Sequence, residues 1–153
     1  MLPASDDALS APEADPIPGE IAALAPSGLF DAAWYCARYP DVAAAAGDPL
    51  EHFCRYGWQE LRQPNPWFDT EWYLAQNHDV TADGVNPLLH YLNWGDAEGR
   101  RPAPDFDPAW YRATHAPPPG VSALAHYLGH RRSGKVSPVA WFDADWYWHQ
   151  NPD

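Results

Sequence analysis

Apolar and polar positions follow a pattern that returns four times along the chain. The phrase Phe-Asp-x-x-Trp-Tyr has starts that are 38, 38 and 36 residues apart, from the differences 68−30, 106−68 and 142−106. A fixed period between about 20 and 50 residues is typical of repeat proteins. The phrase begins and ends at Phe30 and Tyr35, Phe68 and Tyr73, Phe106 and Tyr111, and Phe142 and Tyr147.

Each phrase has the features of a helix start. Its aspartate is a candidate N-cap, because a short acceptor side chain can bind free backbone N–H groups. The Phe before it and the Tyr four residues after it then form a hydrophobic staple, which fixes how the chain enters the helix. The four capping residues are Asp31, Asp69, Asp107 and Asp143.

A second phrase predicts a second helix in each of the first three units. It starts at Asp48, Asn86 or Ser122, and a proline follows the first two where a missing N–H is tolerated. Gly57 and Gly95 stand where a left-handed residue would end this helix. The third copy keeps the pattern but lacks both the proline and the glycine.

The two phrases together predict an all-α fold, a helical-repeat array of α-α hairpins with about 36–38 residues per unit. Helical spacing places Leu50, Phe53 and Tyr56 on one apolar stripe of a second helix. Asp41 and Asp79 can each cap a short extra turn between the paired helices. One hairpin cannot bury its apolar face alone, so neighbouring units must stack. The expected helices cover residues 31–39, 49–56, 69–77, 87–94, 107–114 and 122–131, with a last helix from about 143.

The segment before the repeats has a different composition. Residues 1–27 hold five prolines and no aromatic residue, which predicts a disordered acidic leader with at most one helical turn at Ile21–Leu24. The fourth unit stops where its second helix should follow. We expect the chain to be the amino-terminal part of a longer protein, with a natural half-unit cap as the alternative. The repeat module is expected over 28–153, as units 28–66, 67–104 and 105–140 and a half unit 141–153.

Charge and hydropathy narrow the classes of partner. The formal net charge is −12, which disfavours nucleic acid and anionic membrane surfaces, since phosphate binding needs clustered Lys and Arg. The start of the chain has neither the basic region nor the apolar run of a secretory signal. No stretch approaches the roughly 18 apolar residues of a membrane span. A cytoplasmic location follows as the expectation, with an extracellular one as the alternative.

No motif in the chain predicts catalysis, a cofactor or a metal. A nucleophile elbow, a phosphate-cradling glycine loop and a His-Glu-x-x-His pair are all absent from the sequence. A histidine recurs in the second helix, and we expect it to bind a neighbouring loop rather than a ligand. His130 makes an i, i+4 pair with the last of these, a spacing that suits a metal but lacks a third ligand nearby. The recurring histidines are His52, His90 and His126.

The two cysteines, Cys36 and Cys54, stand where the next unit has leucine. We expect both to be small buried hydrophobes, with a disulfide as the alternative.

A tryptophan beside each staple is the best candidate for a binding surface. It has two interpretations. The ring can pack between units, or it can form a ridge that stacks on sugars or grips a peptide. The series consists of Trp34, Trp72, Trp110 and Trp146.

The combined phrases resemble a bacterial repeat. It flanks the catalytic domains of large glycosyltransferases of cell-surface polysaccharide synthesis, and similar repeats occur in some secreted, calcium-binding or adhesin-like proteins. The likeness covers about residues 28–153, although the third unit has Ala116 and Pro117 in place of Pro-Asp. It implies a non-catalytic interaction or spacer module, at the amino-terminal side of a glycosyltransferase, that binds a protein partner or a glycan. A segment of a secreted adhesin-like protein is the alternative.

Overall fold

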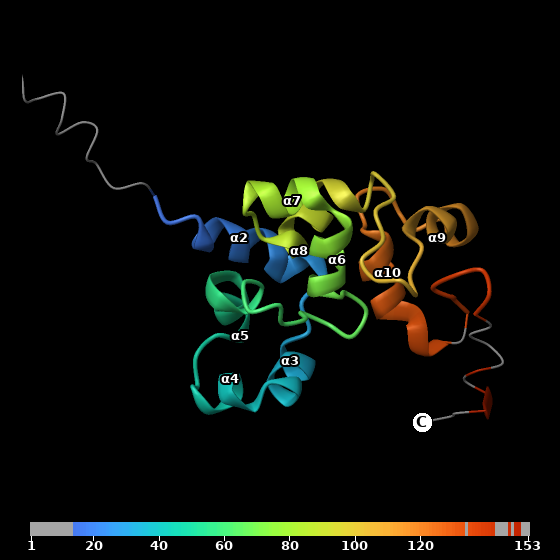
Figure 1. Ribbon diagram of the computed structural model, residues 1–153. Helices are drawn as coiled ribbons and strands as arrows, with labels where there is room; N and C mark the ends of the chain where they lie inside the picture. Colours follow the sequence, from blue (N-terminus) through green and yellow to red (C-terminus); the bar gives the residue numbers. More distant parts are fainter. Residues whose placement is uncertain (1–13, 134, 143–146, 148, 151–153) are drawn as a thin grey trace, which may run out of the picture.

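The computed structural model describes residues 14–133, 135–142, 147 and 149–150 of the chain, and in this part it is all-α (Figure 1). The described residues form no β-strand, only two isolated bridges that approach the start of the second and third units. The α-helices run over Ile17–Leu24 (α2), Ala32–Arg38 (α3), Pro40–Ala44 (α4), Pro49–His52 (α5), Thr70–Gln76 (α6), His78–Asp83 (α7), Pro87–His90 (α8), Pro108–His115 (α9) and Ala123–His130 (α10). Two 3-10 turns, Ala25–Ser27 (η1) and Arg131–Ser133 (η4), and two π-helical turns, Phe53–Gly57 (η2) and Tyr91–Gly95 (η3), complete them.

The caps predicted for the paired helices start them as expected, whereas the caps predicted at Asp41 and Asp79 are wrong, because these residues lie inside α4 and α7. The side chains of Asp31, Asp69 and Asp107 accept hydrogen bonds from the backbone N–H three residues on, at 3.0, 3.0 and 3.1 Å. The caps of the second helices do the same for nearby N–H groups: Asp48 for Leu50, Asn86 for Leu88 and Ser122 for Ala125. Asp143 lies outside the described residues.

The Phe–Tyr staples form in every unit, but they are not equally buried. Their ring centroids lie 5.1, 5.1, 5.4 and 5.4 Å apart in the four units. Phe68 and Phe106 are fully buried, whereas Phe30 and Phe142 are half-buried and Tyr147 is exposed. The phenylalanines of the outer staples are therefore less buried than those of the two central ones.

Each of the first three units is closed by one backbone hydrogen bond. The N–H of its capping aspartate donates to the carbonyl of a proline near the end of the same unit. The pairs are Asp31 with Pro64 at 3.1 Å, Asp69 with Pro102 at 2.9 Å, and Asp107 with Pro138 at 3.0 Å. The first and last turns of a unit are therefore held side by side before the next unit begins.

The recurring Glu-x-Arg of the first two units forms a clamp. Arg62 binds both carboxylate oxygens of Asp41 at 2.8 and 2.9 Å, and Arg100 binds those of Asp79 at 2.9 Å each. Each arginine also pairs with the glutamate two residues before it. The clamp ties the short extra helices, α4 and α7, to the turn that ends the unit.

The role expected for Gly57 and Gly95 is wrong. Neither has a positive φ, and each ends a π-helical turn instead of capping the helix. A Cβ on Gly57 would collide with the hydroxyl of Tyr35, and one on Gly95 with the hydroxyl of Tyr73. The positions are glycine because a buried tyrosine of the paired helix approaches the backbone there.

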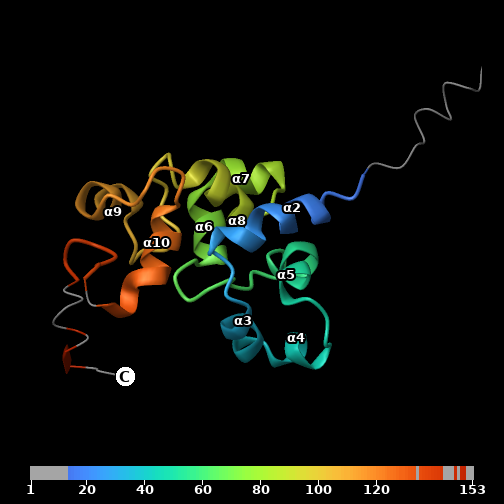
Figure 2. The ribbon, with the colours of Figure 1, turned by 180° about the vertical axis from the view of Figure 1, so that it is seen from behind.

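The structure also differs from the expected leader. Residues 17–24 form a helix of eight residues, α2, and the following residues form the turn η1. Leu24 is fully buried, and Ile17 and Ile21 pack against the core at helical spacing. α2 lies between α5 and α8 and contacts both, as Figures 1 and 2 show from opposite sides. Its prolines do not prevent the helix, since they stand at its start, where proline is tolerated.

The first and third units also meet. Gly28, with φ at +79°, lies where an added Cβ would be 3.5 Å from the Cβ of Ala125 in α10. A hollow of about 340 Å³ beside it is lined by Phe30 and Asp31 from one side and by Leu128 from the other. The packing therefore joins units that are not neighbours in sequence.

Candidate functional site

The tryptophans beside the staples do not form an exposed ridge. Trp34, Trp72 and Trp110 stand at the third residue of α3, α6 and α9, and each is half-buried. Trp110 packs against the core, with its ring 5.6 Å from that of His115. Trp146 lies outside the described residues. The contacts of Trp110 fit the packing interpretation, and a binding role for the tryptophan series stays a prediction.

The strongly exposed aromatic rings of the first two units lie elsewhere. Tyr56 is 58% exposed and Trp94 is 61% exposed, and both stand four residues after the recurring histidine. His130 holds the same position in the third unit and is also exposed.

The expectation that Tyr56 belongs to the apolar stripe is therefore wrong. Tyr56 lies within the π-helical turn Phe53–Gly57, as Trp94 lies within Tyr91–Gly95. A π-helical turn is wider than an α-helical one, so residues after its start no longer follow the α-helical face. Such turns are frequent at functional sites.

The recurring histidines bind inside their own unit. Nδ1 of His52 shares a hydrogen bond of 2.9 Å with the hydroxyl of Tyr35, and His90 does the same with Tyr73. His126 and the hydroxyl of Tyr111 lie 2.6 Å apart. The expectation of a bond to a neighbouring loop is wrong, because the partner is the staple tyrosine of the first helix.

Burial affects the protonation of the tyrosine and histidine side chains that share these hydrogen bonds. It raises the pKa values of the Tyr35, Tyr73 and Tyr111 hydroxyls, and it lowers the pKa values of His90 and His126. The charge of His130 adds to the lowering at His126. A neutral Tyr–His bond is therefore favoured at His90 and His126, where it holds the two helices of the unit together.

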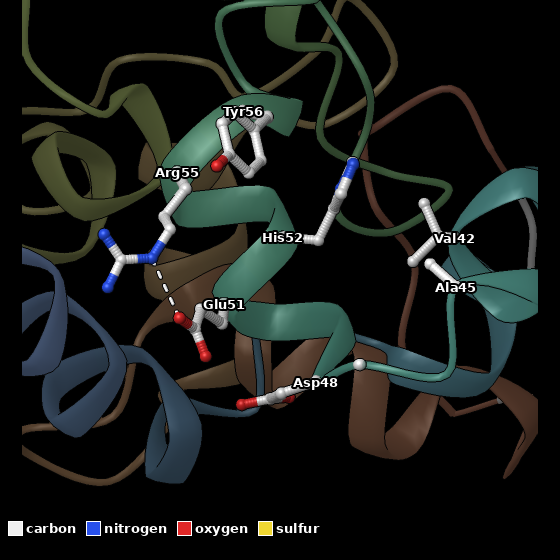
Figure 3. Close-up of a pocket in the computed structure, with 8 residues that line it drawn as sticks. Val42, Ala45, Asp48, Glu51, His52, Arg55 and Tyr56 are labelled. Atoms are coloured by element: carbon white, nitrogen blue, oxygen red, sulfur yellow. Dashed lines mark hydrogen bonds and ion pairs between the residues drawn. The ribbon is translucent and has the colours of Figure 1, made fainter.

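A cavity of about 350 Å³ opens between α4 and α5 of the first unit. Figure 3 shows Glu51 and Arg55 on one side of the α5 helix, and His52 on the other side, where it faces residues of α4. The Arg55 Nε donates to Glu51 Oε1 at 2.8 Å, and its Nη2 donates to Asp15 at 2.9 Å. The full lining is Val42, Ala45, Gly47, Asp48, Glu51, His52, Arg55 and Tyr56.

The matching surface of the second unit has a different chemistry. Leu89 replaces Glu51, and Asn93 replaces Arg55. The cap residue Asn86 is buried, and its amide donates to Glu20 of α2 at 3.0 Å, whereas Asp48 is exposed. The first unit therefore presents an aromatic ring together with charged side chains, and the second presents an aromatic ring beside uncharged ones.

A buried polar cluster lies at the junction of the second and third units. Asp96 is 4% exposed and forms an ion pair with Arg112. It also accepts hydrogen bonds from the Tyr91 hydroxyl at 2.7 Å and from the Ala123 N–H at 3.1 Å. Sequence reasoning missed this cluster because its members come from different units. Apart from the buried Arg112 Nε, its groups bind one another, so we assign the cluster to folding.

The cysteines behave as packing residues. Cys54 is buried and Cys36 is half-buried, and both are free thiols. Burial raises the pKa of the Cys54 thiol to about 12, which keeps it protonated and unreactive.

His126 and His130 are no more suited to metal than the sequence indicated. Their rings stack at 4.1 Å, and Nδ1 of His130 binds the carbonyl of His126 at 2.8 Å. Within the described residues no group of three or more potential ligands is positioned to hold a metal ion.

No helix in the described part of the chain has both the length and the apolar character needed to cross a bilayer. No protein-family model matches the chain, and no curated protein and no solved structure shows significant similarity to it.

Proposed function

We propose that the chain is a non-catalytic helical-repeat module that binds a partner through the exposed aromatic residues of its second helices. The observation that carries this proposal is the exposure of Tyr56 and Trp94 at the same place in consecutive units. Large exposed aromatic rings enlarge the apolar surface in contact with water, and they are common in binding surfaces. A recurring position supports contacts with a partner that extends over more than one unit.

Three recurring contacts support the repeat-array part of the proposal. The capping aspartate, the Tyr–His bond and the backbone bond from aspartate to proline recur in the first three units. Identical contacts at a fixed period are what a stack of equivalent units requires. The contact between the first and third units makes this stack more compact than an extended solenoid.

The parent protein is proposed from the sequence resemblance alone. The module belongs to a bacterial glycosyltransferase of envelope polysaccharide synthesis, acts in the cytoplasm and binds either a protein partner or the growing glycan. The alternative is a secreted adhesin-like or calcium-binding repeat protein. The reading frame beyond residue 153 separates the two, through a glycosyltransferase domain or through glycine- and aspartate-rich calcium repeats.

Affinity electrophoresis tests the binding role directly. The chain is run through gels that contain the surface polysaccharide of the organism that encodes it. We expect retardation of the wild type and its loss in the Tyr56→Ala/Trp94→Ala double variant. The matched control is Trp34→Ala/Trp72→Ala, in which half-buried rings are removed and the exposed ones stay. A wild type that is not retarded contradicts glycan binding and leaves a protein-binding or spacer role.

A further inference from the structure

We propose that the cavity between α4 and α5 binds an uncharged saccharide unit, with Tyr56 as its stacking surface. This inference rests on the proposed binding function and specifies its ligand and its site. The cavity, of about 350 Å³, lies within the roughly 300–1,000 Å³ that small-ligand sites occupy.

The aromatic ring supplies the apolar half of a sugar site. Tyr56 is 58% exposed and lines the cavity, and its ring lies 5.8 Å from the ring of His52. The face of an aromatic ring is electron-rich, so it attracts the polarised C–H groups on one face of a pyranose. The contact with the His52 ring limits the positions that the Tyr56 ring can adopt, which reduces the entropy lost on binding.

The polar half comes from groups that have bonding capacity left. Oε1 of Glu51 is bound by Arg55, and Nδ1 of His52 is bound by Tyr35. The structure assigns no bond to Glu51 Oε2 or His52 Nε2 among the described residues, and both residues are only half-buried. A carboxylate oxygen accepts from a hydroxyl, while an imidazole nitrogen can donate or accept. Figure 3 shows these two groups on different sides of the helix, so hydroxyls at different positions of the saccharide unit would meet them.

The charge of the lining selects against acidic sugars. Asp48 and Glu51 carry negative charge and Arg55 carries positive charge, so these three side chains sum to −1, in a chain of formal charge −12. Arg55 is already engaged by two carboxylates, those of Glu51 and Asp15. A uronate or a sulfated sugar would meet the two carboxylates of the lining and an arginine that is already engaged, and like-charge contacts of this kind reduce affinity for the wrong ligand.

Comparison with the second unit shows which binding groups are specific to the first unit. Trp94 offers a larger stacking ring than Tyr56, but the positions of Glu51 and Arg55 hold Leu89 and Asn93. Stacking alone does not distinguish one sugar from another, because most pyranoses have an apolar face. The first unit therefore selects the sugar, and Trp94 extends the contact along the chain of a longer glycan.

The test is an NMR titration of the full chain with four uncharged tetrasaccharides, built from glucose, mannose, galactose and N-acetylglucosamine. An oligogalacturonate of the same length is the charged comparator. We expect at least one neutral oligosaccharide to shift the ring signals of Tyr56 and His52, and the oligogalacturonate to leave them unchanged. Affinity should fall about tenfold in Tyr56→Ala, the loss that corresponds to one ring-stacking contact.

Matched variants separate the cavity from the aromatic series. Tyr56→Phe keeps the stacking ring and should retain binding of the oligosaccharide. Glu51→Gln should weaken that binding. In Trp94→Ala the oligosaccharide should still shift the ring signals of His52. The inference is overturned if no neutral oligosaccharide shifts these signals, if the oligogalacturonate binds better, or if Tyr56→Ala and Glu51→Gln bind like the wild type. If Tyr56→Ala and Glu51→Gln keep the affinity of the wild type while the polysaccharide still retards the chain in gels, the proposed function is supported and the proposed sugar site is wrong.

Discussion

The first two units and the third share some contacts and differ in others. All three have the capping aspartate, the Tyr–His bond and the backbone bond that closes the unit. The third lacks the glycine and the arginine clamp, and its second helix, α10, is a regular α-helix. In place of the clamp, His115 Nε2 accepts from the Ser137 N–H at 3.2 Å. The comparison separates contacts that define the hairpin from contacts that tie down its extra helix.

The junctions between units differ as well. At the junction of the second and third units, Asp96 and Arg112 stand where the first junction has Trp58 and Leu74. Both residues of the earlier pair pack against the core, whereas the later pair forms an ion pair between the buried Asp96 and the partly exposed Arg112. The pair contributes less to stability than its geometry indicates, because the Asp96 carboxylate loses its hydration while solvent reaches Arg112 and screens the attraction. The third unit is therefore joined by a polar contact and the second by an apolar one.

The largest effect is expected from the central staple. Phe68→Ala removes a fully buried ring and should lower the free energy of unfolding by about 3–5 kcal/mol. Phe30→Ala should cost clearly less, because Phe30 is half-buried. Urea titrations of the two variants give both values. Equal losses would mean that the outer and central staples are equivalent in solution.

A glycine exchange compares the two kinds of second helix. Gly95→Ala places a Cβ against the buried hydroxyl of Tyr73 and should cost about 1–3 kcal/mol. Gly129→Ala in α10 meets nothing within 4 Å and should stabilise by up to about 1 kcal/mol.

The double variant Gly95→Ala/Tyr73→Phe identifies the cause of the stability loss expected for Gly95→Ala. If the clash with the hydroxyl is responsible, removing that hydroxyl recovers part of the loss in a thermal melt. If the stability losses of the two single variants add in the double variant, the cause of the Gly95→Ala loss lies in the backbone of the π-helical turn.

The Tyr–His bonds predict a pH dependence near neutrality. His90 and His126 have folded-state pKa values below the unfolded value of about 6.5, mainly because burial disfavours the charged ring. The unfolded chain therefore takes up protons first, and stability should fall as the pH drops from about 7.5 to 5.5. Urea midpoints at the two pH values measure this. The difference should shrink in His90→Gln/His126→Gln, and an unchanged difference would assign it to other groups.

The smallest effect is expected from the clamp that the third unit lacks. Arg100 lowers the pKa of Asp79 to about 2, but the carboxylate is exposed, so solvent screens the pair. Asp79→Asn should lower the melting temperature slightly at low salt and have no effect at about 1 M salt, where charges are screened within about 3 Å. A loss that persists at high salt would mean that the clamp acts by packing.

Features that depend on neighbours in sequence could be predicted. Asp31 and Ser122 cap helices because of the few residues that follow them, and the paired helices follow from these caps. Features that depend on tertiary contacts could not. The role of Gly57 depends on Tyr35 from another helix, and the Asp96–Arg112 pair joins residues of different units.

The candidate site shows the same division. The period identified Tyr56 and Trp94 as matching positions, but their exposure depends on π-helical turns that the apolar spacing does not reveal. The helix α2 could have been found from the spacing of Ile17, Ile21 and Leu24, a signal that its surrounding prolines concealed.

The backbone bond from Asp31 to Pro64 has a genetic consequence. Because the backbone hydrogen bond of each unit joins two residues of that same unit, a duplication or deletion of one whole period leaves the remaining bonds intact. An insertion inside a segment separates the two residues that must meet. Lineages that carry this chain should therefore vary in length by whole periods, through unequal recombination, far more often than by fractions of one.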